Sequence, residues 1–467
     1  MPSRIRILAG QSARFFYRRL PLPLPVKWRM KSFLYRHLGM FLKNSVNYQQ
    51  WLIQTAATRT ATGQASGHAA HLPLLGTGLG GADSPLIGPI PHTSGIPSAP
   101  EAGPVRLIAF YLPQYHPIPE NDRWWGKGFT EWTNVTKAMP NFVGHYQPRL
   151  PADLGFYDLR LPEVREEQAT LARHYGIYGF CYYYYWFAGK RLLTRPLDEV
   201  VQSGRPDFPF CVCWANENWS RRWDGLDTEI LIAQKHSDDD DLNFIKALEP
   251  ALRDRRYIRI HGRPLLLVYQ PSLLPNAART AEIWRRHCRQ AGLVEPYVTA
   301  VQSLGFTENP LGFGFDAAVE FPPHATAVLA KQPAKMLNPD FRGRFYDYVA
   351  TAEYFMTRPP MPYPFFRTAM PSWDNTARRQ DTSDIFLNAE PEHYERWLRR
   401  LVEQTRGYRP PEKRWVFINA WNEWAEGNYL EPDQRFGHRY LEATRNALGD
   451  HGTMPRQPGD GGVGDFP

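Results

Sequence analysis

The feature that most constrains the fold is a series of eight short apolar runs, rich in β-favouring residues, spread between residues 105 and 449. Such runs, bounded by turn signals, are typical of buried strands. In chain order they are the run that opens Arg106–His116, then Gly176–Phe187, Phe208–Asn218, Pro264–Gln270, Pro296–Ser303, Phe315–His324, Phe365–Met370 and Trp415–Ala420.

Segments with helical periodicity lie between most of these runs. They are Leu161–Tyr175, Leu197–Gln202, Leu242–Arg253, Thr280–Gln290, Glu392–Gln404 and, after the last run, Tyr440–Leu448. Eight strands alternating with helices predict an α/β protein, a (β/α)8 TIM-like barrel. A doubly wound sheet is the alternative, but no GxGxxG or other Gly-rich phosphate loop follows the first strand.

Polar and aromatic side chains gather where six of the predicted strands end. In a (β/α)8 barrel functional residues lie at the carboxyl ends of the strands, so these side chains predict a single pocket. They are Gln114, Tyr115 and His116; Tyr184, Tyr185 and Trp186; Trp214, Asn216, Glu217 and Asn218; Glu320 and His324; Trp373, Asp374 and Asn375; and Asn422, Glu423 and Glu426.

The strongest candidate for chemistry is the stretch that follows the eighth strand. Glu423 and Glu426 are three residues apart and lie among Trp421, Trp424 and Tyr429. Aromatic rings pack on the apolar faces of sugars, and paired carboxylates transfer protons at a glycosidic bond. A capped helix start or surface salt bridges are the alternative explanation for a pair of acids at this spacing.

Further candidates lie in the loops. The Gly- and Trp-rich segment after the first strand is predicted to cover the pocket with Trp124, Trp125, Glu131 and Trp132. Glu217 is the next best acid after the glutamate pair. Asp374 could bind a sugar hydroxyl or could form an Asx turn.

Several motifs also resemble a known family. FYLPQYHPIPENDRWWGKGFTEWTNV, HYQPRLPADLGFYDLR, GFCYYYYWFAGKRLL, WANENWSRRWDG, PSWDNTAR and WNEWAEGNYLEPD, in this order, resemble the WbsX-like family of bacterial surface-polysaccharide biosynthesis proteins, which covers 106–448. That family is similar to the endo-α-mannosidase glycoside hydrolases, whose catalytic motif is N-E-W-x-E-G.

The resemblance implies a glycan-active barrel in which Glu426 is the general acid/base. Glu423 would assist attack by the sugar's own 2-hydroxyl, which gives retention through an anhydro-sugar. Ala425 departs from the His that the hydrolases commonly carry. Two other functions stay open: a glycosyltransferase that uses an activated donor, for which Arg221 and Arg222 are the nearest basic cluster, and a non-catalytic glycan-binding barrel.

The charge of the chain is concentrated in its first part. Residues 1–54 carry ten of the Lys and Arg and no acid. Because the whole chain has a net charge of +8, the rest of it carries about −2. We therefore expect no nucleic-acid partner. This basic, amphipathic arm either contacts a membrane surface or a polysaccharide-assembly partner or is a poorly ordered tail. A flexible linker over 55–104 and a disordered tail over 450–467 are predicted to flank the barrel at 105–449.

The remaining composition indicates a cytoplasmic protein. The four cysteines fit buried, reduced thiols, and no signal-peptide core or run of 18 apolar residues occurs. Asp238–Asp241 lacks the spacing of a calcium loop and is predicted to be the acidic first turn of a helix. His116, His145 and His324 show no metal-binding spacing, so we expect neither a metal nor another cofactor.

Overall fold

The barrel is formed by eight parallel strands. The computed structural model of the protein describes residues 105–221, 226–324, 326–408 and 414–449. In chain order the strands are β1 (Arg106–Tyr111), β2 (Ile177–Phe187), β4 (Phe210–Trp214), β8 (Arg263–Val268), β9 (Tyr297–Val301), β10 (Ala317–Val319), β12 (Phe365–Ala369) and β14 (Trp415–Ile418). Seven of the eight predicted runs contain one of these strands, and β8 begins one residue before its predicted run, Pro264–Gln270.

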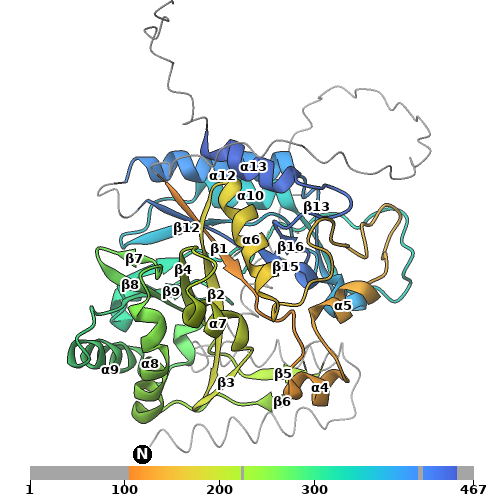
Figure 1. Ribbon diagram of the computed structural model, residues 1–467. Coiled ribbons are helices and arrows are strands. Elements are labelled where there is room, and N and C mark those ends of the chain that lie inside the picture. The colour runs from red at the N-terminus through yellow and green to blue at the C-terminus, as the bar shows by residue number, and fades with distance from the viewer. Residues whose placement is uncertain (1–104, 222–225, 325, 409–413, 450–467) are drawn as a thin grey trace, which may run out of the picture. The chain divides into compact units, whose positions relative to one another are not determined.

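The pairing closes the sheet (Figure 1). β1 pairs in parallel with β14, from Arg106 opposite Trp415 onward, and also with β2. The other neighbours follow the chain order, from β2 through β4, β8, β9, β10 and β12 to β14. The prediction of a (β/α)8 barrel is confirmed, and the doubly wound alternative is wrong because the eight strands pair in a closed ring, whereas an open sheet has two edge strands.

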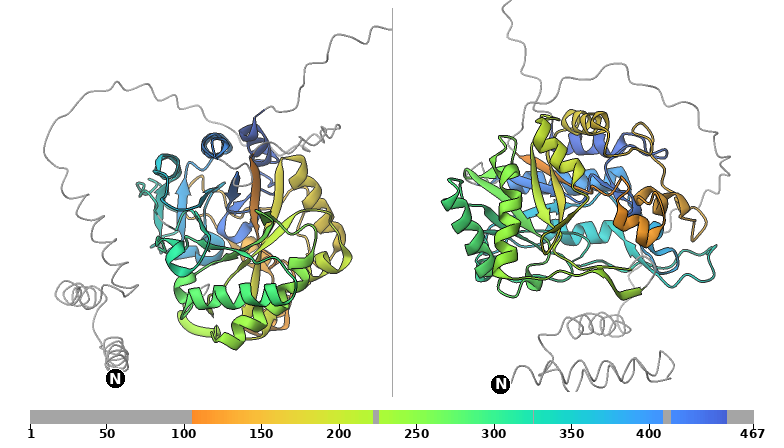
Figure 2. Two further views of the ribbon diagram at one scale, coloured as in Figure 1. Left: turned by 90° about the vertical axis from the view of Figure 1, so that its left-hand side faces the viewer. Right: turned by 60° about the horizontal axis from the view of Figure 1, so that its bottom comes forward.

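Helices surround the barrel in all three views (Figures 1 and 2). They are α6 (Pro162–His174), α7 (Arg195–Ser203), α8 (Asp238–Arg253), α9 (Ala277–Gln290), α10 (Tyr348–Thr357), α12 (Pro391–Arg406) and α13 (Arg439–Leu448). Asp238–Asp241 form the first turn of α8, and the Ser237 hydroxyl accepts a hydrogen bond from the Asp240 amide. Acids in this turn favour the positive end of the helix dipole, as the sequence predicted.

Two features differ from the regular prediction. Between β9 and β10 the described chain forms only the 3-10 turn η3 (Pro310–Phe313) rather than an α-helix. Several βα connections are long and carry elements that periodicity did not indicate. These are α4 (Pro119–Trp125), α5 (Glu131–Lys137), β3 (Lys190–Leu192), the β5–β6 hairpin (Trp219–Arg221 and Leu226–Ile232), the β11–β13 pair (Arg344–Asp347 and Asp384–Leu387) and α11 (Thr376–Arg379).

The side-chain alternation of β2 separates the barrel interior from the layer under the helices. Tyr183 packs on Phe110 with ring centroids 5.8 Å apart, inside the barrel. Its neighbours Tyr184 and Trp186 instead contact Phe244 of α8, at 5.6 and 5.9 Å. Tyr183 therefore faces inward, and Tyr184 and Trp186 pack against α8.

The arm over 1–54, the linker over 55–104 and the tail over 450–467 lie outside the described residues, so those boundaries stay predictions. All four cysteines are free and buried, as expected. Within the described part of the chain, no helix is long and apolar enough to cross a bilayer.

The buried carboxylate of Glu320, which follows β10, allows a test of what stabilises the barrel. It accepts hydrogen bonds from Arg358 at 2.8 Å and Arg367 at 3.1 Å and is fully buried. It therefore faces α10 and β12 rather than contributing to the predicted pocket.

Glu320→Ala leaves two largely buried guanidinium groups without their partner, so we expect it to lower the free energy of unfolding by about 3–5 kcal/mol in urea titrations. Glu353→Gln, which removes an exposed pair with Arg396, should cost under about 1 kcal/mol; equal losses would contradict this account.

Candidate active site

The chain after β14 forms a compact turn that carries both glutamates. Glu423 ends β15 (Asn422–Glu423), Glu426 ends the 3-10 turn η6 (Trp424–Glu426), and β16 (Asn428–Tyr429) pairs back on β15. Asn422 fixes this turn to the end of β1, because its amide bonds both the Leu112 N–H and the Leu112 carbonyl, at 2.7 and 3.0 Å. The predicted sugar contact of Asn422 is therefore replaced by a backbone bridge.

The two glutamates meet on one guanidinium, that of Arg378. Arg378 Nη1 donates to Glu426 Oε1 at 2.5 Å, and Nη2 donates to Glu423 Oε2 at 3.0 Å. A third carboxylate, Glu131 from the start of α5, lies 3.2 Å from Nη2. Side chains from three different βα connections thus form one charged cluster, and surface salt bridges cannot account for Glu423 and Glu426.

Burial dominates the electrostatics of this cluster. It raises the pKa of Glu423 to about 8, against the opposing charge of Arg378 and together with the like charge of Glu426. Burial also raises the pKa of Glu426, again opposed by Arg378. The side chain of Glu423 is 7% exposed and that of Glu426 is 23% exposed. Glu426 is therefore the acid that solvent reaches more easily, and such raised pKa values are typical of catalytic carboxyls.

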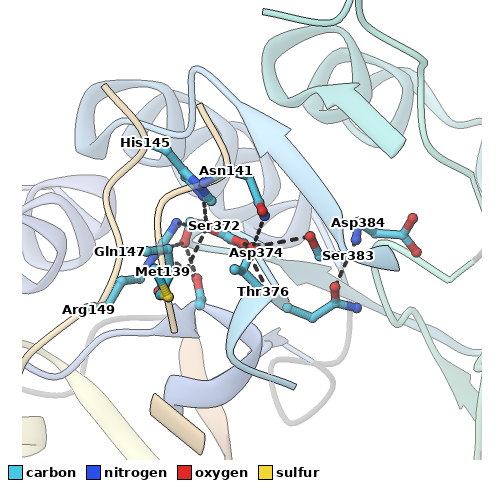
Figure 3. Close-up of polar contacts among 12 residues, drawn as sticks. Met139, Asn141, His145, Gln147, Arg149, Ser372, Asp374, Thr376, Ser383 and Asp384 are labelled. Carbon is cyan, nitrogen blue, oxygen red and sulfur yellow. Dashed lines mark hydrogen bonds and ion pairs between the residues drawn. The ribbon is translucent and has the colours of Figure 1, made fainter. Parts of the chain in front are cut away.

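Asp374 lies four residues before Arg378, at the centre of a separate network of polar contacts (Figure 3). Its Oδ2 accepts hydrogen bonds from His145 at 2.7 Å and Gln147 at 2.8 Å, and its Oδ1 accepts one from the Thr376 amide at 3.1 Å. The carboxylate is buried and already has several donors, so it is not available to a sugar hydroxyl. The Asx-turn alternative is the one observed, and it starts the short helix α11 that carries Arg378.

The tautomer of His145 follows from its two contacts. Its Nδ1 lies 2.9 Å from the Asn141 amide and accepts that hydrogen bond, so the proton sits on Nε2 and is donated to Asp374. Burial alone would raise the pKa of Asp374, but the hydrogen bonds from His145 and Thr376 and the charge of Arg149 hold it well below its usual range. Asp374 therefore stays ionised and keeps its network together.

A layer of predicted site residues lies beneath the glutamate turn. The Tyr115 hydroxyl donates to the Asn422 carbonyl and accepts from the Trp424 amide. Trp132 packs on Tyr115 at 4.7 Å and on Trp424 at 5.5 Å. All four side chains are at least nine-tenths buried, so they support the turn rather than contact a glycan.

Other predicted residues face away from the glutamates, which corrects the prediction for them. Trp214 stacks on Phe244 of α8 at 4.5 Å and is fully buried, and the Trp186 indole donates to Asp240. Both lie on the outward side of their strands. Asn216 uses its amide to bond both backbone groups of Gln270, which joins the ends of β4 and β8.

Four further predicted site residues belong neither to the layer beneath the glutamate turn nor to the residues that face away from the glutamates. Glu217 is half-buried and accepts a hydrogen bond from the Gln270 side chain, and its charge raises the pKa of Tyr269. His116 is buried, and burial lowers its pKa. Trp125 contacts the Phe129 ring at 6.0 Å, and Trp373 lies 6.0 Å from the ring of His324.

A row of half-buried aromatic rings leads from the cluster to the rim of the barrel. Burial raises the pKa of Tyr185, and the nearby charge of Glu423 adds to the shift. The Tyr185 ring lies 5.1 Å from that of Trp219 in the β5–β6 hairpin, which in turn lies 5.9 Å from Trp124 of α4. Figure 1 shows α4 beside this hairpin. Tyr185 and Trp124 were predicted, whereas Trp219 was missed although it stands in the quoted WANENWSRRWDG.

Arg378 was the main omission of the sequence analysis. It is the last residue of the quoted PSWDNTAR, a motif that was singled out for Trp373 and Asp374. Nothing in its local pattern indicates that it reaches acids at positions 131, 423 and 426. Only the closure of the barrel brings these segments together.

Comparisons with known proteins agree on the family. The family model described as "Glycosyltransferase WbsX" matches residues 107–444. Two curated relatives, both named "Uncharacterized protein WxcX" and both from Xanthomonas campestris pv. campestris (strains B100 and ATCC 33913), are 52% identical over 353 residues, which is 75% of this chain. The chain spans about half the length of these relatives, since the match covers 50% of each.

Solved structures show a more distant likeness. A GH99 endo-alpha-mannosidase from Bacteroides thetaiotaomicron aligns with a TM-score of 0.46 at 16% identity, over 73% of this chain and 96% of that one. A structure described as "Glycoside hydrolase-like protein" gives a TM-score of 0.46 at 15% identity, over 78% and 97%.

The raised pKa of Glu423 predicts a pH-dependent effect on stability. Since its pKa is about 8 when folded and roughly 4.3 when unfolded, the native state binds the extra proton between these values, and stability falls as pH rises through that window. Glu423→Gln removes this loss. We expect its melting temperature relative to the wild type to increase from pH 5 to pH 8, by about 1–3 °C, in calorimetric scans. Glu353→Gln is the exposed control, and a difference that shrinks toward pH 8 would contradict the assignment.

Proposed function

The chain belongs to the WbsX glycosyltransferase family, and we propose that this glycan-acting enzyme works as a retaining, endo-acting glycoside hydrolase in bacterial surface-polysaccharide biosynthesis, such as that of lipopolysaccharide or O-antigen. The observation that carries the proposal is the buried pair Glu423 and Glu426 held on one guanidinium. Because the two carboxylates bond neighbouring nitrogens of the same guanidinium, they lie on one side of the site and close to each other. That favours retention, with carboxyls about 5–5.5 Å apart, over inversion, at about 6.5–9.5 Å.

The exposure of the two acids supports their division of roles. Glu426, the more exposed, suits the general acid that protonates the departing glycosidic oxygen. Glu423, the deeper one, acts in its ionised form, which predominates above its pKa of about 8. It accepts the proton of the 2-hydroxyl as that oxygen attacks the anomeric carbon and forms an anhydro-sugar. In the second half, Glu426 takes a proton from the attacking water, and Glu423 returns its proton to the 2-oxygen. Each acid ends in its starting state.

A transferase with a nucleotide-activated donor is the second candidate, favoured by the family description. Such a donor needs cationic groups for its diphosphate. The guanidinium of Arg378 already binds Glu131, Glu423 and Glu426, so a phosphate would have to displace carboxylates from it. The proximity of three acids therefore favours an uncharged leaving group, that is, a sugar hydroxyl.

The aromatic row from Tyr185 through Trp219 to Trp124 supports a binding site for several sugar units. Its rings are half-buried and lie on elements at the rim, so a chain bound at the glutamates could extend along it. The basic arm at 1–54 would bring the barrel to an anionic membrane or an assembly partner, as part of the same proposal.

Product analysis tests the reaction directly. Wild type, Glu426→Gln and Glu423→Gln are incubated with surface glycan from cells that carry the gene, with and without nucleotide sugars. We expect oligosaccharide release that needs no donor and falls by about 10²–10⁴-fold in both variants. Glu403→Gln, an exposed acid on α12, is the matched control. Chain growth that occurs only with added donor would establish the transferase instead.

A second test addresses the aromatic row. Trp219→Ala should raise KM for long oligosaccharides about tenfold with little change in kcat, because stacking away from the reacting bond contributes to uniform binding. Substrates too short to reach Trp219 should show no change, and Tyr354→Ala on the outer face of α10 serves as control. A fall in kcat at constant KM would place Trp219 at the reacting sugar. It would contradict the proposal that the aromatic row binds sugar units away from the reacting bond.

A further inference from the structure

The guanidinium of Arg378 has contacts that a phosphate- or sugar-binding arginine does not need. Nη1 bonds Glu426, Nη2 bonds Glu423, and Glu131 approaches from the side at 3.2 Å from Nη2 and 3.4 Å from Nε. The Arg378 side chain is only 12% exposed and that of Glu131 is fully buried. Its planar fork is therefore filled by the protein's own carboxylates.

The segment that carries Arg378 is fixed to the glutamate turn by separate bonds. The Asp374 amide donates to the Glu426 carbonyl at 2.7 Å, and Arg149 Nη1 donates to the Gly427 carbonyl at 2.9 Å. Gly427 has φ +58°, and a Cβ there would lie 2.9 Å from the Asp374 carbonyl oxygen. This close backbone approach holds α11 and η6 in one register, so the position of Arg378 relative to the two acids is set before any substrate binds.

Two acids in a buried site repel each other, and without a counter-charge neither ionises easily. The proposed chemistry nevertheless needs one ionised and one protonated carboxyl at the same time. Arg378 lies between them and stabilises a negative charge on either one. Glu131 accepts a hydrogen bond from Nε and lies within ion-pair distance of Nη2, and this contact opposes rotation of the guanidinium toward only one glutamate.

We propose that Arg378, held by Glu131, is a positioning residue that fixes Glu423 and Glu426 side by side and stabilises the negative charge on whichever of the two is ionised. This inference rests on the proposed function for its consequence in catalysis, but not for its consequence in the titration of the two acids. It assigns a role to Arg378 and Glu131 that the sequence motif around the glutamates does not contain.

The first experiment is a carboxyl titration that needs no substrate. Protein carrying ¹³C at the glutamate δ-carbon is followed by NMR from pH 4 to 11, with Glu423→Gln and Glu426→Gln to assign the two signals. We expect Arg378→Met to raise the titration midpoints of both glutamates by about one pH unit or more, because a cation in contact lowers a carboxyl pKa by about 1–3 units. Arg396→Met removes an exposed arginine and should leave both midpoints unchanged. Midpoints that do not move in Arg378→Met would overturn the proposal.

Kinetics then separate positioning from support of the fold. Arg378→Met should lose most of kcat, shift the pH profile to the alkaline side, and regain activity when guanidinium ions are added at millimolar concentration. Arg378→Lys, which keeps the charge but not the fork, should fall between it and the wild type, and it provides the measurement if Arg378→Met does not fold. Equal loss at every pH with no recovery by guanidinium would overturn the proposal.

The two proposals fail in different ways. If the wild type released no oligosaccharide from any surface glycan, the hydrolase proposal would fall, while the titration would still decide the role of Arg378. If hydrolysis occurred but the titration midpoints were the same in the wild type and in Arg378→Met, only the proposed positioning role would be wrong. Glu131→Gln provides an independent check. It removes a like charge beside the two glutamates, so it should lower the same two titration midpoints, and by a smaller amount.

Discussion

The site depends on one buried arginine that is shared by three acids. Taking a guanidinium or a carboxylate out of water costs several kcal/mol each, and their mutual attraction offsets this only when the geometry is good. Arg378 satisfies the condition by binding Glu131, Glu423 and Glu426 from three different connections. None of these charges could be buried alone, so the loops after β1, β12 and β14 take their positions together.

Polar side chains around the charge cluster hold it in place. Asn422 bonds the glutamate turn to Leu112, Asn216 bonds the end of β4 to Gln270, and Asp374 collects donors from the segment around His145. The two asparagines bond backbone groups where the strand ladder ends. The carboxyl ends of the barrel are therefore rigid through side-chain to backbone bonds, and a rigid frame is what a pair of acids needs to stay at a working distance.

The strands could be predicted because buried parallel strands are continuous apolar runs, as Phe210–Trp214 and Trp415–Ile418 show. The glutamate turn could be predicted because acids and aromatics follow the last run directly. The direction in which individual side chains point could not be predicted. Trp214 ends its strand as expected, but the alternation of the strand turns its side chain toward α8. Asn216 looked like a ligand because its pairing with Gln270, 54 positions away, has no local signal. Arg378 is 45 and 48 positions from its glutamates, and only barrel closure reveals the contact.

The family description as a glycosyltransferase and a hydrolase-like pair of acids are compatible in physical terms. In the proposed mechanism the first half-reaction is the same for both outcomes, since it ends with an anhydro-sugar and an ionised Glu426. The second half depends on which hydroxyl reaches Glu426, whose side chain is the more exposed of the pair. Water gives hydrolysis, whereas a sugar hydroxyl held along Tyr185 and Trp219 gives transfer without any nucleotide donor. The balance between the two then depends on how well the aromatic row excludes water when a second glycan lies on it.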